Sequence, residues 1–121
     1  MEMNGIETPT LTGAALDYAV AVASGQKNPQ PGLDGECVVS HGHTLHRFCP
    51  STEWAHGGPL LDTFAVSVTP LSDAQWRAEE FITHETAVGN EYLVAAMRCI
   101  VMAELGQIVK VPEQLCRRDS T

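Results

Sequence analysis

Two long and almost uninterrupted apolar runs dominate the hydrophobic pattern of the chain. Residues 14–23 hold a single charged residue, Asp17, and residues 91–105 hold three, of which Arg98 lies in the middle of the run. Alanine, leucine and methionine, which favour helices, are frequent in both runs. We therefore predict two helices. Because each is apolar nearly all round rather than along one stripe, we expect both to be buried on several sides.

The residues that flank the two runs fit helix boundaries. Thr12 precedes the first run and Asn90 precedes the second, and both side chains can accept a hydrogen bond from a free amide at a helix start. Gly25 and Gly106 follow the runs and suit the left-handed backbone that often ends a helix.

Shorter segments have the alternation and the turn residues that are typical of strands. Residues 37–39 and 44–48 flank a glycine-containing turn and predict a hairpin. Residues 63–69 alternate larger apolar with smaller side chains, which predicts a strand with one buried face. Residues 108–111 predict another short strand, ended by Pro112.

The remaining internal segments are predicted from their breakers and capping residues. Residues 26–36 hold two prolines and two glycines and predict an exposed loop. The stretch STEWAHGGPLLD, residues 51–62, predicts a shaped loop because of its Gly-Gly-Pro. Residues 72–82 predict a short helix, with a strand at 77–82 as the alternative, and residues 83–90 predict a loop.

These elements predict an α+β fold in which two apolar helices pack on a small, mostly antiparallel β-sheet. A length of 121 residues fits one domain, residues 1–121, and we expect loosely ordered ends at about 1–9 and 116–121. A monomer of this size offers few places that cover a helix on all sides. Either the helix at 91–105 lies centrally against a sheet, or a second copy provides part of the cover, and we expect a homo-oligomer.

Charge and segment length exclude several classes of partner. Seven basic against fifteen acidic residues give a net charge of -8, which disfavours nucleic acids and anionic membranes. No apolar run reaches the ~20 residues of a membrane span, and no signal-like start is present. We expect a cytoplasmic protein with reduced thiols.

Asp17 and Arg98 are the formal charges in the middle of the two predicted helices. A charge removed from water needs a partner, so the two residues either pair with each other or lie at a solvent-facing edge. The alternative is that Arg98 points into a pocket, where its planar guanidinium holds an anionic ligand.

Three segments, in order, resemble the NinX-like proteins of temperate bacteriophages and prophages. They are LTGAALDYAVAVASG at 11–25, STEWAHGGPLLD at 51–62 and EYLVAAMRCIVMAELG with the following VPEQL at about 91–115. The family forms are LTGAALDWAVAKAEG, STDWAQGGPII and LIAAMRCYVASKLG followed by VPEEL. Tyr18, Glu53 and His56 depart from them, as does GNEY at the entry to the last segment. The resemblance implies a phage accessory domain of unknown biochemical activity.

The stretch STEWAHGGPLLD allows two interpretations. In the first, Trp54 fills the core and the glycine pair only makes the turn. In the second, Trp54 forms the wall of a cleft and the backbone around the glycines binds a planar, partly anionic molecule such as a nucleotide. The candidate ligand-binding residues are Tyr18, Ser51, Trp54, His56, Gly57, Gly58 and Arg98.

A second candidate site is a cluster of five possible zinc ligands within thirteen residues: Cys37, His41, His43, His46 and Cys49. The spacing matches no standard zinc module, and the alternative is a histidine-rich polar hairpin. With zinc bound and one position open, Glu36 or Glu53 would serve as a general base for hydrolysis.

The sequence therefore favours a non-catalytic phage or prophage protein that binds a small, nucleotide-like ligand in a cleft around residues 51–62. A protein-interaction module that docks a host factor on its acidic surface is the first alternative. A zinc-dependent hydrolase is the second. A triad of Ser51, His56 and Asp62 can be written, but no nucleophile-elbow motif accompanies it, so we expect a binding protein rather than an enzyme.

Overall fold

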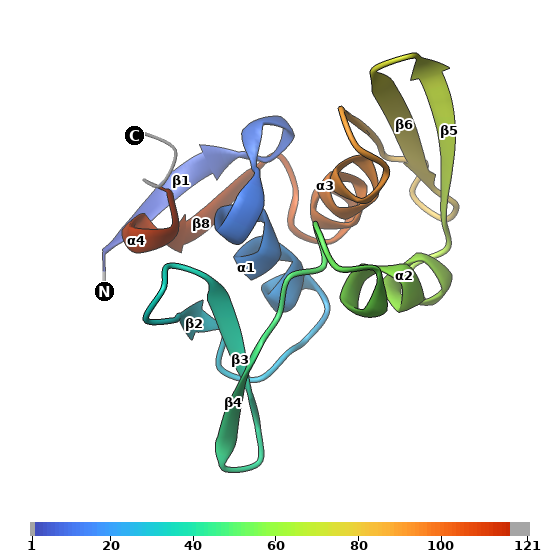
Figure 1. Ribbon diagram of the computed structural model, residues 1–121. Helices are drawn as coiled ribbons and strands as arrows, with labels where there is room; N and C mark the ends of the chain where they lie inside the picture. The colour runs from blue at the N-terminus through green and yellow to red at the C-terminus, as the bar shows by residue number, and fades with distance from the viewer. Residues whose placement is uncertain (1, 117–121) are drawn as a thin grey trace.

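The computed structural model describes residues 2–116 and confirms the α+β class, with helices and small antiparallel sheets in similar proportion (Figure 1). In chain order the elements are β1 (Met3–Glu7), the 3-10 helix η1 (Thr8–Thr10), α1 (Gly13–Ala23), β2 (Gln30–Pro31), β3 (Cys37–His41), β4 (Thr44–Arg47), α2 (Trp54–Thr63), β5 (Val66–Ser72), β6 (Gln75–Glu80), β7 (Thr86–Gly89), α3 (Tyr92–Leu105), β8 (Ile108–Pro112) and α4 (Glu113–Cys116).

Helices α1 and α3 form the centre of the molecule, and the strands lie around them (Figure 1). The single sheet that the sequence predicts is replaced by three separate antiparallel sheets, β1–β8, β2–β3–β4 and β5–β6–β7. Helix α1 packs against β3 and β8, whereas α3 covers one face of β5–β6–β7. Each small sheet thereby buries one face against a central helix.

The core consists mainly of side chains from the two predicted helices. Residues 15–21 of α1 and most of residues 95–101 of α3 are buried, as their nearly all-round apolar pattern predicts. Thr12 is the N-cap residue of α1, as expected, although its side chain makes no capping hydrogen bond. Glu91, and not Asn90, is the N-cap residue of α3.

The N-terminal segment is more ordered than its sequence suggests. Strand β1 pairs antiparallel with β8, with Glu7 opposite Ile108, although a loose start is expected for residues 1–9. Thr8 is fully buried, and its hydroxyl donates to the Gly106 carbonyl oxygen at 2.6 Å. The segment forms a strand because it pairs with β8, which lies about a hundred residues later in the chain, and no local sequence pattern indicates such a partner. Residues 117–121 lie outside the described part of the chain.

Predictions for residues 51–90 need three corrections. Residues 54–63 form helix α2 rather than a loop. Residues 75–80 form strand β6, so the helix predicted over 72–82 is wrong. The alternative, a strand at 77–82, names the correct type of element but begins and ends two residues too late. The segment predicted as a loop at 83–90 contains β7. Strand β6 has a partner on each side, β5 and β7, and this pairing overrides its helix-favouring composition.

The hairpin predicted at 37–39 and 44–48 is confirmed as β3 and β4, joined through Gly42 in left-handed backbone, φ 64°. The strand predicted at 63–69 is observed three residues later, as β5, with Val66 and Val68 half-buried on one face. The predicted strand at 108–111 is β8.

Two adjacent glycines of α2 have different surroundings. A Cβ added to Gly57 would collide with the Pro50 carbonyl oxygen and lie 3.2 Å from Leu93 Cδ2 of α3. The atoms nearest to a Cβ added to Gly58 would belong to the indole of Trp54, at 2.8 Å, and this side chain is 59% exposed, so it can shift at little cost. Helix α2 therefore approaches Pro50 and α3 closely because residue 57 has no side chain.

We expect Gly57→Ala to destabilise the protein by about 1–3 kcal/mol through overpacking. Gly58→Ala is the matched control, and its better helix propensity should leave stability unchanged or raise it by up to about 1 kcal/mol. Urea denaturation of both variants measures this. Equal effects of the two substitutions would contradict the packing described for α2.

Candidate functional site

A cleft of about 620 Å³ lies between the β3–β4 hairpin and one face of α2. The hairpin and the connection that follows it form one wall, and the first two turns of α2 form the other. The lining residues are Gln26, Val39, His41, His46, Arg47, Phe48, Glu53, Ala55, His56, Pro59 and Leu60. Five of them come from residues 53–60, so the stretch that the sequence singled out does border a cavity.

Two histidines of the hairpin lie side by side in this cleft. The ring centroids of His41 and His46 are 4.6 Å apart. The Thr44 hydroxyl donates its hydrogen to the His41 carbonyl oxygen at 3.0 Å, so it accepts from His46 Nε2 at 2.8 Å. In the neutral ring of His46 the proton therefore sits on Nε2, which leaves Nδ1 as a free acceptor.

The third histidine, His56, is held by the connection before α2. Its Nδ1 accepts a hydrogen bond from the Cys49 amide at 3.0 Å, and its ring stacks on Phe48 with centroids 5.8 Å apart and an interplanar angle of 18°. Because Nδ1 is an acceptor, the ring proton sits on Nε2, where it can donate to a ligand. This donor has a fixed direction because both the hydrogen bond and the stack hold the ring.

Arg47 and Glu53 add charges of opposite sign to the lining. Arg47 Nη2 lies 3.4 Å from Cys49 Sγ, and this weak contact leaves most guanidinium donors available. The lining also includes the apolar side chains of Val39, Pro59 and Leu60. The cleft thus combines apolar surface with several hydrogen-bond donors, which is the usual composition of a small-molecule site.

Most residues that the sequence proposed for ligand binding lie elsewhere. Trp54 is 59% exposed and packs beside Tyr92, outside the cleft lining. Gly57 is buried against Pro50, so its backbone is closed to a ligand. Gly58 lies under the Trp54 indole. His56 is the member of the proposed set that lines the cleft.

Asp17 and Arg98 do not pair with each other. Arg98 Nε donates to the Leu11 carbonyl oxygen at 2.8 Å, and Nη1 donates to that of Val88 at 2.9 Å. The guanidinium therefore ties β7 to the segment before α1 rather than pointing into the cleft. Asp17 instead accepts a hydrogen bond from the Ser51 amide at 2.9 Å, and Tyr18 is buried beside it in the core.

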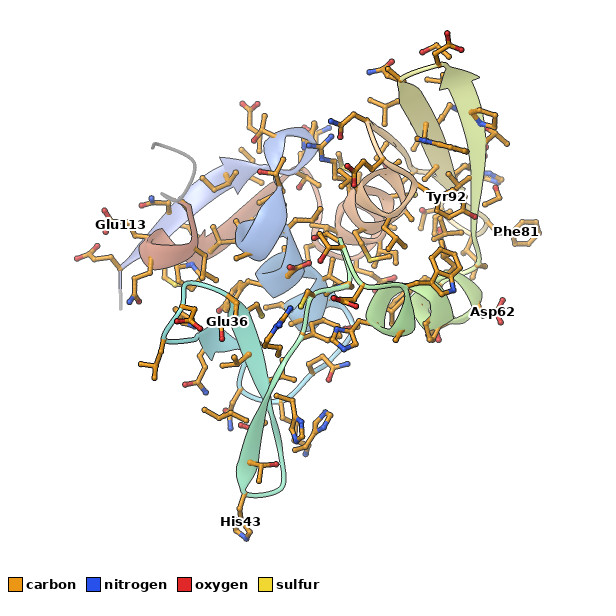
Figure 2. The ribbon with its side chains drawn as sticks, in the orientation of Figure 1. Glu36, His43, Asp62, Phe81, Tyr92 and Glu113 are labelled. Carbon is orange, nitrogen blue, oxygen red and sulfur yellow. The ribbon has the colours of Figure 1, made fainter. Side chains whose placement is uncertain are left out.

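The five candidate zinc ligands are not brought together. Cys37 is buried in the core, where burial raises the pKa of its thiol to about 12, and a thiol in that state is a poor metal ligand. His43 lies in the turn at the far end of the hairpin, outside both strands (Figure 2). Within residues 2–116 no three His, Cys, Asp or Glu side chains are placed to hold a metal ion.

The polar and aromatic lining residues that the sequence analysis missed are Arg47, Phe48 and Gln26. The hairpin register places Val38 opposite Arg47 and Val39 opposite His46. The two-residue turn fixes this register, so the closeness of His41 and His46 could have been predicted from the sequence. No sequence signal indicated that α2 would pack against this hairpin.

The contact between Asp17 and Ser51 makes stability depend on pH. Burial raises the pKa of the Asp17 carboxyl from its ordinary value of 3.8 to about 6, although the hydrogen bond from the Ser51 amide acts in the opposite direction. The protonated form therefore favours the fold. This contribution is complete below about pH 4 and is lost as pH rises through about 6.

We expect the Asp17→Asn variant to lack this pH-dependent contribution to stability, although its side-chain oxygen can still accept the hydrogen bond from the Ser51 amide. The free energy of unfolding of the wild type, relative to the variant, should fall by about 3 kcal/mol at most between pH 4 and pH 7. Denaturant titrations at intermediate pH values measure it. Parallel pH profiles of the two proteins would show that the Asp17 carboxyl is not buried as described.

Comparison with known proteins places the chain in a family. No curated protein matches it at a significant level. In residues 2–116 no helix has both the length and the apolar character needed to cross a membrane. The family described as Bacteriophage P22, NinX matches residues 7–104, a range that includes α1, the cleft and nearly all of α3. The chain therefore belongs to the bacteriophage P22 NinX family.

Proposed function

We propose that this phage accessory protein binds a small, planar anion of the nucleotide class in the cleft between the β3–β4 hairpin and α2, and that it acts in the cytoplasm of the bacterial host. The proposal rests on one observation. In a chain of net charge -8, Arg47 and three histidines line one cavity together with apolar side chains.

The chemistry of the lining supports an anion with a ring system. Arg47 presents a planar fork of donors that suits phosphate or carboxylate, and the Nε2–H of His56 adds a directed donor. The stacked pair His41 and His46 offers a flat surface to a ring. Glu53, also in the lining, can accept a hydrogen bond from an amine or a hydroxyl of the ligand.

The test is calorimetric titration with a panel of nucleoside monophosphates, the matching nucleosides and inorganic phosphate. We expect binding of one or more monophosphates and loss of at least about tenfold in affinity in Arg47→Gln, because a charge-assisted hydrogen bond contributes about 1.5–3 kcal/mol. His56→Gln should also weaken binding, since its directed donor is displaced.

His43→Gln is the matched control, because it changes a histidine of the same hairpin that lies at the tip outside the cleft (Figure 2). Its affinity should equal that of the wild type. If no member of the panel binds, or if the substitution of His43 acts as strongly as those of Arg47 and His56, the cleft is not the ligand site.

We also propose that two copies associate through an apolar surface beside β8. Val22, Leu105 and Ile108 are 43%, 37% and 60% exposed and border a hollow of about 270 Å³. Ile108 also borders a second hollow, of about 290 Å³. In the proposed dimer a twofold axis brings the same apolar surface of both copies together, so that Ile108 of each copy packs against the hollow of the other.

Sedimentation velocity tests this association. A charge placed in a buried apolar contact is strongly unfavourable, so Ile108→Glu should shift the wild-type dimer to a monomer. Ile82→Glu is the control, because Ile82 is 76% exposed and borders neither hollow. A wild type that is monomeric at all concentrations, or a dimer that survives Ile108→Glu, would refute the proposed interface.

A further inference from the structure

An aromatic cluster lies on the side of α2 that does not line the cleft. It consists of Trp54 at the start of α2, Tyr92 at the start of α3 and Trp76 on β6. The ring centroids of Trp54 and Tyr92 are 5.7 Å apart, and those of Tyr92 and Trp76 are 5.3 Å apart. Figure 2 shows Tyr92 between α2 and the β5–β6 hairpin. Both tryptophans of the chain belong to this cluster.

The cluster is accessible although it is large and aromatic. Trp54 is 59% exposed, and Tyr92 and Trp76 are half-buried. The Trp54 indole lies over Gly58, so one face is supported by α2 and part of the ring remains open. Tryptophan and tyrosine with open faces are the side chains most enriched among residues that dominate protein interfaces.

The charges around the cluster favour a cationic partner. Tyr92 directly follows Glu91, whose side chain is exposed and makes no capping hydrogen bond to α3. In residues 2–116 the ion pairs involve Glu79 and not Glu91, so the Glu91 carboxylate can attract a cation. Arg77 alternates with Trp76 on β6 and therefore points to the opposite sheet face. Arg98 is occupied by two main-chain carbonyls. No basic side chain of these neighbours competes for the aromatic faces.

We propose that the cluster formed by Trp54, Tyr92 and Trp76 is a docking site for an arginine-bearing segment of a partner protein. A guanidinium stacks on an indole face through cation–π and planar contact, and the net charge of -8 attracts a basic segment from a distance. Arginine is favoured over lysine because its flat, weakly hydrated head matches the flat rings.

The probes are three labelled peptides of equal length: glycine alternating with three arginines, the same peptide with lysines, and an uncharged proline-rich peptide. Fluorescence anisotropy measures their affinity for the full chain. We expect the arginine peptide to bind most tightly and to change the intrinsic tryptophan emission, because both tryptophans are at the site.

Substitutions at Trp54 separate stacking from simple charge attraction. Trp54→Leu keeps an apolar side chain but removes the aromatic face, and it should weaken the arginine peptide about fivefold. Trp54→Phe retains an aromatic face and should stay closer to the wild type. Phe81→Leu is the matched control, because Phe81 is a 73% exposed aromatic residue that lies outside this cluster.

Two results would overturn the proposal. Equal affinity for the arginine and lysine peptides, unaffected by Trp54→Leu, would mean that the acidic surface as a whole attracts basic peptides. Tighter binding of the proline-rich peptide would mean that the aromatic cluster serves a different class of partner. Circular dichroism of each variant confirms that the fold is retained, as the exposure of Trp54 leads us to expect.

Discussion

The buried hydrogen bond between the Ser51 amide and the Asp17 carboxylate is the contact on which the arrangement of the remaining elements depends. It joins the middle of α1 to the segment between β4 and α2. A carboxylate that is only 5% exposed loses most of its hydration, and the hydrogen bond from the Ser51 amide replaces part of what is lost. The anchored segment then turns at once, because the amides of Thr52 and Glu53 donate to the Cys49 carbonyl oxygen.

This anchor determines where α2 begins, and α2 in turn separates two surfaces of different chemistry. One face of the helix, with His56, closes the polar cleft against the β3–β4 hairpin. Trp54, on the first turn, packs instead beside Tyr92, which in turn contacts Trp76 of the β5–β6 hairpin. The close approach of Gly57 to Pro50 and Leu93 fixes the helix between them. A shift of α2 would therefore alter both surfaces together.

The sequence predicted the parts of the fold that local pattern determines. The two central helices follow from apolar runs that have no polar stripe, and the β3–β4 hairpin follows from its turn. Helix α2 could not be predicted, because Gly57 and Pro59 disfavour helix locally and are accommodated by tertiary packing. Strand β6 contains residues that favour helix, and only its pairing on both edges makes it a strand. A cavity does border residues 53–60, but Arg47 lines it only because the hairpin packs against α2, and no local pattern encodes that packing.

Amide hydrogen exchange at Ser51 tests the central contact most directly. If the Asp17 carboxylate holds this amide in the core, Ser51 should exchange as slowly as the central amides of α1. The Asp17→Ala variant should then accelerate exchange at Ser51 and in the first turn of α2 while the centre of α3 stays protected. Fast exchange at Ser51 in the wild type, at the rate of an amide open to solvent, would contradict the account.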